Sequence, residues 1–98
     1  MKKQQRNYVE LHSHNILNVM FRLKDDTGKL AGMQELYDAV QPFTTGDLHK
    51  PKTRLKKATT AVNTIVDQVD LQQFETLDHI LCDNMRAYLR ELRHAFSC

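Results

Sequence analysis

A twelve-residue stretch near the start of the chain, RNYVELHSHNIL, contains the side chains best suited to chemistry. Its arginine, glutamate, histidines and asparagines are residue types that transfer protons, bind phosphate or hold metal ions. Which of them can act together depends on the element that carries them, and the apolar spacing here is helical. Residues four apart on a helix share a face, so the stretch and its continuation predict one solvated polar stripe. That stripe contains Glu10, His14, Asn18 and Arg22.

The two histidines of this stretch are predicted to lie on different faces. His12 is about 200° from His14 around a helix, beside the apolar residues Val9 and Ile16. The pair therefore cannot hold one metal ion on a regular helix. A histidine on an apolar seam needs a hydrogen-bond partner, and it can fix helix register or oligomeric state.

Two short motifs in the same stretch resemble patterns of known families. Arg6-Asn7 followed by His12 resembles the R-N-x4-H signature of HEPN ribonucleases, which are small all-α domains. That resemblance implies RNA cleavage by Arg6 and His12, usually across a dimer, although the family places the motif deep in its domain. His14-x-Ile16-Leu17-Asn18 resembles the H-x-L-x-N element around the phosphoacceptor histidine of sensor kinases. This second resemblance implies a phosphoryl relay through His14 without kinase activity, because no Gly-rich nucleotide-binding region follows.

Long segments without glycine or proline predict an all-α fold, a small bundle of about four helices in one domain spanning residues 1–98. The expected helices cover residues 4–25, 29–41, 52–69 and 70–96. Gly28 suits the C-cap of the first helix, and Pro42 is expected to end the second. The first helix is expected to bury a seam of Val9, His12, Ile16, Val19 and Leu23, which Tyr8, Leu17, Met20 and Phe21 widen. The third carries a seam of Leu55, Ala58, Val62, Ile65 and Val69.

The boundary between the third and fourth helices is predicted from a break in this seam at Gln72. Asp70 followed by Gln73 resembles an N-cap and its partner, so a new helix is expected from there. One long helix with a sharp bend is the alternative. The positions expected to face inward on the fourth helix are Phe74, Leu77, Leu81, Met85, Tyr88 and Leu92. Helices of such unequal length leave apolar surface that a second copy of the chain could cover, which favours a dimer.

Composition indicates a soluble globular protein, with 41% hydrophobic and 27% charged residues in 98. No apolar run approaches the roughly 18–20 residues of a membrane span, and MKKQQRNYVEL lacks the apolar core of a signal peptide. Two cysteines are too few for a disulfide scaffold, so reduced thiols and a cytoplasmic location are expected.

Cysteine and histidine spacing on the fourth helix offers two candidate pairs of metal ligands. His79 and Cys82 are three residues apart, and His94 and Cys98 are four apart, so each pair shares a face. The pairs lie about 22 Å apart along one helix, too far to hold one ion. The chain is therefore expected to bind no metal and no cofactor, with Cys82 half-buried and Cys98 at a frayed end.

The charge distribution is the strongest indication of function. The segment HKPKTRLKK (49–57) has five basic residues and no acid, although the whole chain has a net charge of only +2. These cations, Lys50, Lys52, Arg54, Lys56 and Lys57, gather at the start of the third helix. Cations at a helix N-terminus are disfavoured by about 0.3–1 kcal/mol each, and such a departure from local preference often marks function. The alternative is neutralisation by the acid-rich run 67–83, within the bundle or across a dimer.

These observations favour a non-catalytic helical interaction protein, such as a small regulator, inhibitor or adaptor. It would bind a macromolecular partner, most simply a protein, through a helix face and the basic segment 50–57. The first alternative is a dimeric nucleic-acid-binding regulator that uses the same segment. Against it, the segment contains no interleaved aromatic residue. The second alternative is a HEPN-like ribonuclease that uses Arg6 and His12.

Overall fold

The computed structural model describes residues 1–97, and its regular elements are all helical. In chain order they are α1 (Lys3–Thr27), α2 (Met33–Val40), the 3-10 helix η1 (Gln41–Thr45), α3 (Pro51–Leu71) and α4 (Thr76–Ser97). The described residues contain no strand, which confirms the prediction of a small all-α bundle with four α-helices.

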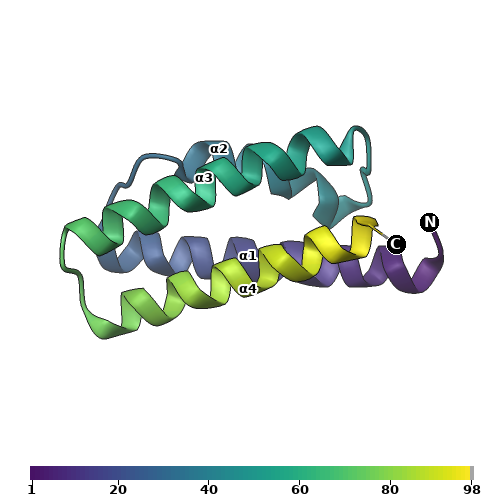
Figure 1. The fold of residues 1–98 in the computed structure, drawn as a ribbon. Helices are drawn as coiled ribbons and strands as arrows, with labels where there is room; N and C mark the ends of the chain where they lie inside the picture. Colours follow the sequence, from purple (N-terminus) through teal and green to yellow (C-terminus); the bar gives the residue numbers. More distant parts are fainter. Residues whose placement is uncertain (98) are drawn as a thin grey trace.

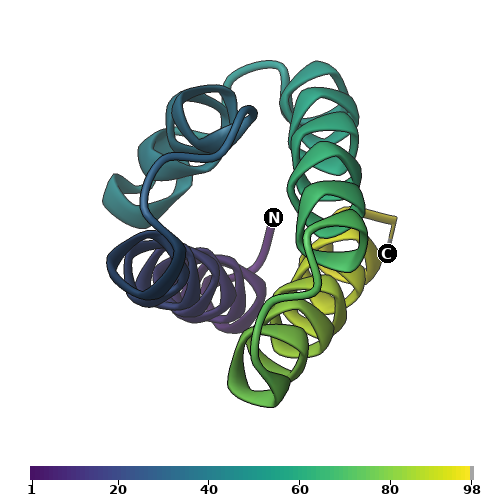
Figure 2. The same ribbon diagram turned by 90° about the vertical axis from the view of Figure 1, so that its left-hand side faces the viewer.

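The helices run alternately up and down along the long axis of a molecule 41 Å long (Figure 1). Seen from one end, α1, α2 with η1, α3 and α4 occupy the four corners of a rough square (Figure 2). Each element packs against its neighbours in sequence, and α4 closes the bundle against α1. This topology places the start of α1, the start of α3 and the end of α4 at one end of the molecule.

The boundaries of α1 agree with expectation, and Gly28 is its C-cap, with an amide that donates to the carbonyl of Lys24. The prediction for the second helix was wrong at its start, whereas α2 ends at Val40, one residue before the predicted end. The chain turns through residues 28–32 before α2 begins at Met33, and it continues past Pro42 as η1. Pro42 does not stop the helical path because it occupies the first turn of η1, where no amide hydrogen is needed.

The turn between the last two helices lies later than predicted. α3 continues through Asp70 to Leu71, so Asp70 is not an N-cap, and α4 begins only at Thr76. The chain reverses through Gln72–Glu75, where Gln73 has a left-handed φ of 53°. The helices are therefore two antiparallel rods rather than one bent helix (Figure 1). A break in the apolar seam marked the turn, but α3 includes two exposed residues, Asp70 and Leu71, beyond Val69, its last buried residue.

The core joins all four helices, and the predicted seam of α3 is buried at every position. The seams of α1 and α4 are rotated from the prediction. In α1, Ser13 is buried, His12 and Val19 are only half-buried, and Tyr8 and Phe21 are exposed. In α4, Leu77 is 43% exposed, and the buried set includes Leu81, Met85 and Leu92 together with Asp78, Cys82, Leu89 and Ala95. Each rod touches two neighbours rather than one, so its buried face is wider than a single heptad seam.

The turn before α2 is fixed to α3 by the side-chain amide of Gln68, which pairs with the backbone of Ala31. Gln68 accepts a hydrogen bond from the Ala31 amide at 2.9 Å and donates one to the Ala31 carbonyl at 2.7 Å. The next residue, Gly32, lies so close to α3 that an added Cβ would be 3.0 Å from the Ala61 carbonyl oxygen. The absence of a side chain at Gly32 therefore allows α2 to approach α3.

We predict that Gly32→Ala lowers the free energy of unfolding more than Gly46→Ala. Both glycines have left-handed backbone, with φ of 94° and 85°, which costs an alanine about 1–2 kcal/mol. Gly46 has only ordinary contacts, whereas Gly32 would also clash with backbone, which costs about 1–3 kcal/mol more. Urea denaturation of both variants measures the difference. Equal destabilisation would contradict close packing of α2 on α3.

We also predict that Ser13→Ala raises the free energy of unfolding by about 1 kcal/mol. Ser13 is fully buried in α1, and its hydroxyl has no hydrogen-bond partner among the described residues. An unsatisfied buried hydroxyl costs about 1–3 kcal/mol, and alanine removes it while improving helix propensity. Thermal and urea unfolding test this. A decrease in stability would mean that the hydroxyl is bonded in the folded protein.

Candidate functional site

The five cations of the basic segment lie in and just before the first two turns of α3. Lys50 is the N-cap residue with a left-handed φ of 48°, and Pro51 begins the helix. No side chain caps these first turns. The four lysines of the segment are exposed and form no ion pair within residues 1–97. Four of the five predicted cations are thus available to a partner.

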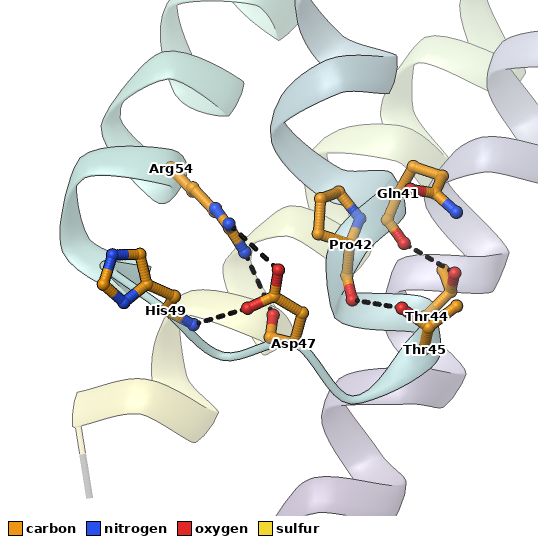
Figure 3. A network of polar contacts seen from close by, with 7 residues as sticks. All are labelled: Gln41, Pro42, Thr44, Thr45, Asp47, His49 and Arg54. Atoms are coloured by element: carbon orange, nitrogen blue, oxygen red, sulfur yellow. Dashed lines mark hydrogen bonds and ion pairs between the residues drawn. The ribbon is translucent and has the colours of Figure 1, made fainter.

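Arg54, the fifth, is held inside the chain (Figure 3). Its guanidinium donates to the Asp47 carbonyl at 3.0 Å and to the Asp47 carboxylate at 3.2 Å. The same guanidinium lies 5.7 Å from the ring centroid of Phe43, a cation–π contact. Arg54 therefore fixes the loop between η1 and α3 on the core instead of facing solvent freely.

The carboxylate of Asp47 organises this loop. It accepts a hydrogen bond from the His49 amide at 3.0 Å on one oxygen and from Arg54 on the other. The His49 bond and then the Arg54 bond lower the pKa of Asp47 below its ordinary value of 3.8. On the other side of the loop, the hydroxyls of Thr44 and Thr45 donate to carbonyls of η1 (Figure 3). The start of α3 is thus positioned by side chains of the loop itself.

A groove of about 340 Å³ lies between the first half of α3 and the last turns of α4. Its lining consists of Lys52, Leu55, Lys56, Thr59, Thr60, Arg93, Phe96 and Ser97. Three of these side chains are cationic, two are large and apolar, and none is a carboxylate. We call this site the basic groove. Its chemistry suits a ligand with negative charge at its edges and a flat or apolar part inside.

The other flank of the basic segment is electrically mixed. Lys56 and Lys57 line a second groove of about 810 Å³ between α2 and α3, together with Arg54. Glu35 and Asp38 of α2 line the same groove. The carboxylates reduce the local positive charge there, so the basic groove is the better site for an anion.

Charge is separated along the molecule. The half that contains the start of α1, the start of α3 and the end of α4 has ten Lys or Arg and three Asp or Glu in residues 2–14, 46–60 and 87–97. We call it the basic end. The opposite half, residues 15–31 and 61–86, has four basic and seven acidic residues. The acid-rich run 67–83 belongs to that far half, so the expectation that it neutralises the basic segment within the bundle was wrong.

Two residues of the basic groove, Arg93 and Phe96, were not predicted to be part of the site. Both belong to the last turns of α4, whereas the predicted site was the contiguous segment before and within α3. The up-and-down topology was the available signal. In such a bundle the end of one helix lies beside the start of its antiparallel neighbour.

The two residues of the HEPN-like motif do not converge. Arg6 and Glu10 lean toward the loop after η1, where a Cβ added to Gly46 would lie 3.9 Å from a guanidinium nitrogen and 3.7 Å from a carboxylate oxygen. Positions 6 and 12 are about 120° apart around α1. His12 instead faces α4. The grooves described above contain neither residue.

His12 lies between two tyrosines. Its ring centroid is 4.2 Å from that of Tyr8 and 5.9 Å from that of Tyr88 on α4. The Nδ1 atom is buried and has no hydrogen-bond partner among the described residues. Beside it, the Tyr8 hydroxyl donates to the Glu91 carboxylate, and this bond is the main cause of a raised pKa of Tyr8. The contacts among Tyr8, His12 and Tyr88 connect α1 to α4, so these two residues of the opening stretch have a structural role. His14, Asn18 and Arg22 are exposed, as the predicted stripe requires, and Glu10 is half-buried.

The cysteine and histidine pairs of α4 do not form a metal site within residues 1–97, where no three suitable ligands come together. His79 pairs with Asp70 of α3 at 3.3 Å. Cys82 is buried rather than half-buried, and burial, followed by the charge of Asp70, raises the pKa of its thiol to about 11. A thiol with so high a pKa stays protonated near neutral pH and is a poor metal ligand or nucleophile. The second pair includes Cys98, which lies outside the described residues.

No protein-family model, curated protein or solved structure matches the chain. Within residues 1–97, no helix has both the length and the apolar character needed to cross a membrane.

The lowered pKa of Asp47 predicts that the loop becomes less ordered in acid. A group whose pKa is lower in the folded state stabilises the fold above its ordinary pKa, and this contribution disappears as the pH falls through the folded value. We expect protection of the His49 amide from hydrogen exchange to fall in that acidic range. Asp47→Asn should remove, at every pH, the part of this protection that depends on the Asp47 charge. Asp67→Asn, on the exposed face of α3, should leave the pH dependence of the protection unchanged. An identical acid profile in Asp47→Asn would contradict this role.

Proposed function

We propose that this protein is a non-catalytic helical interaction protein whose basic end binds an anionic macromolecular partner. The observation that supports the proposal is the basic groove, in which Lys52, Lys56 and Arg93 from two helices meet and the described lining residues include no carboxylate. The other two exposed lysines of the basic segment, Lys50 and Lys57, extend the positive surface beyond the groove. Cations that pair with nothing inside the chain keep their full interaction for a partner.

Arg54 supports the proposal indirectly. Because its guanidinium bonds Asp47 and lies over Phe43, the loop that carries Lys50 is fixed relative to α3. A preorganised surface loses less side-chain and loop entropy on binding than a flexible basic tail does.

We do not propose the ribonuclease alternative, because its two motif residues do not converge within one chain and neither lines the basic groove, where the exposed cations gather. Within one chain, general acid–base work on one phosphodiester would need both groups within hydrogen-bond reach of the same ligand. The packing of His12 between Tyr8 and Tyr88 gives the histidine a different environment from that of Arg6.

We predict that replacing the four exposed lysines with glutamine weakens binding to an anionic partner about tenfold or more, because each exposed ion pair contributes about 0–1 kcal/mol. The variant carries Lys50→Gln, Lys52→Gln, Lys56→Gln and Lys57→Gln. Binding of fluorescent poly-L-glutamate can be followed by anisotropy at about 50 mM and about 200 mM salt, where the affinity of the unmodified protein should fall with salt.

The chain offers a matched control at its opposite half. Replacement of Arg22, Lys24, Lys29 and Arg86 with glutamine removes the same four charges from exposed positions. This control should bind polyanions nearly as well as the unmodified protein. Equal weakening in both variants would mean that net charge, rather than the basic end, determines binding.

The same two variants allow the physiological partner to be identified. A protein captured from extracts of the native host by the unmodified chain and by the control, but not by the lysine variant, would be that partner.

A further inference from the structure

We infer that the basic groove binds single-stranded nucleic acid, with phosphates held by Lys52, Lys56 and Arg93 and an unstacked base placed against Phe96. This inference rests on the proposed function, because it identifies the anionic partner of the same basic end. It differs from the favoured sequence-based hypothesis, in which the partner was a protein.

The energetics of exposed cations favour nucleic acid over an acidic protein. An exposed lysine paired with one carboxylate contributes about 0–1 kcal/mol, which a protein interface must add to a large apolar contact. The same lysine beside a nucleic-acid strand releases condensed counterions, a gain that needs no fixed pairing geometry. The basic end has exposed lysines that form no ion pair within residues 1–97, and its basic groove of about 340 Å³ is small, which fits the second mode better than the first. The larger groove of about 810 Å³ beside it includes Glu35 and Asp38, which would repel an acidic protein surface.

The basic groove also contains an aromatic residue, and the lack of one within the basic segment was the argument against a nucleic-acid partner. No aromatic residue interleaves the basic segment in sequence, but Phe96 of α4 lies among its lysines in space. Its ring is half-buried and packs against Phe43, with centroids 5.2 Å apart. Arg54 lies over the Phe43 ring in turn. Phe96 is therefore a supported aromatic surface with cations beside it, the combination that single-strand binding proteins use.

The shape of the groove selects a single strand. In a duplex the faces of the bases are stacked and only their edges are accessible, so a base cannot reach Phe96. A free strand can place one base in the groove and follow the surrounding cations with its backbone. The surface continues on α3 to Lys50, and on α4 Arg90 lies one turn before Arg93.

Fluorescence anisotropy with labelled probes tests the inference on the full-length protein. The probes are a single-stranded dodecamer of thymidylate, a hairpin duplex with a similar number of phosphates, and poly-L-glutamate of similar charge. The variants are Phe96→Leu, Lys52→Gln with Lys56→Gln, and Arg93→Gln. Arg86→Gln, an exposed arginine of the same helix outside the groove, is the matched control, and thermal melting checks the fold of each protein.

We expect the single strand to bind more tightly than the duplex. Phe96→Leu should weaken single-strand binding about fivefold or more, since stacking on an aromatic contributes about 1–3 kcal/mol, and it should leave duplex binding unchanged. Lys52→Gln with Lys56→Gln should lower the slope of log affinity against log salt by about 1.4, and Arg93→Gln by about 0.7, because each phosphate that is no longer neutralised accounts for about 0.7. Arg86→Gln should change neither quantity by as much.

The outcomes separate this inference from the proposed function. Binding of poly-L-glutamate without binding of the dodecamer would overturn the inference and leave the proposed function intact. Binding of no probe even at low salt would overturn both. Equal affinity for strand and duplex, with no effect of Phe96→Leu, would show a basic surface that does not use the groove, which also overturns the inference. If Phe96→Leu fails to fold, the exposed lysine variant still decides, because an unchanged salt slope contradicts the site.

Discussion

The antiparallel packing of α3 against α4 is the constraint on which the candidate site depends. The turn at residues 72–75 is short, so α4 must run back along α3, and its last turn must lie beside the first turn of α3. That arrangement brings Arg93 and Phe96 to Lys52 and Lys56, although about forty residues separate them in the chain. It also moves the acid-rich run to the far half of the molecule. A single bent helix would have formed neither the groove nor the separation of charge.

The same packing explains how so many cations can gather at the start of a helix. The N-terminus of α3 has positive partial charge, which disfavours the lysines there. The end of α4 lies alongside and has negative partial charge from the carbonyl groups of its last turn, which offsets part of that cost. Arg54 removes a further part, because Asp47 neutralises it locally. The remaining lysines are exposed, and solvent and salt screen their mutual repulsion over about 8–10 Å. The basic end is therefore tolerated by the fold without being neutralised by it.

How much could be predicted from the sequence differed between elements for physical reasons. The fold class and the α3 seam followed from apolar spacing, since a regular helix with one strongly apolar side has few alternatives. The predicted seams of α1 and α4 differ from the buried faces because those faces include polar or small residues, Ser13 in α1 and Asp78 and Cys82 in α4, whose types do not predict burial. Leu77, by contrast, is apolar but exposed in the first turn of α4. The cations of the site were visible as a contiguous run, whereas Arg93 and Phe96 could be found only from the topology. The conformation of Gly32 and its contact with α3 depended on a packing partner that local sequence does not specify.

Arg54 shows why a contiguous charged run is not the same as a binding site. The five cations are close in sequence but differ in the structure. Arg54 is paired with a carboxylate and an aromatic ring, whereas the four lysines are exposed. A planar guanidinium can bond the Asp47 backbone and side chain while lying over Phe43, which a lysine ammonium cannot do with the same geometry. Phe43 in turn supports Phe96 in the basic groove. Arg54 is thus a positioning residue that connects the loop, the core and the groove. Because Arg54 pairs with Asp47, it adds little positive charge to the surface. It instead fixes the loop and the start of α3, and so the positions of the four exposed lysines.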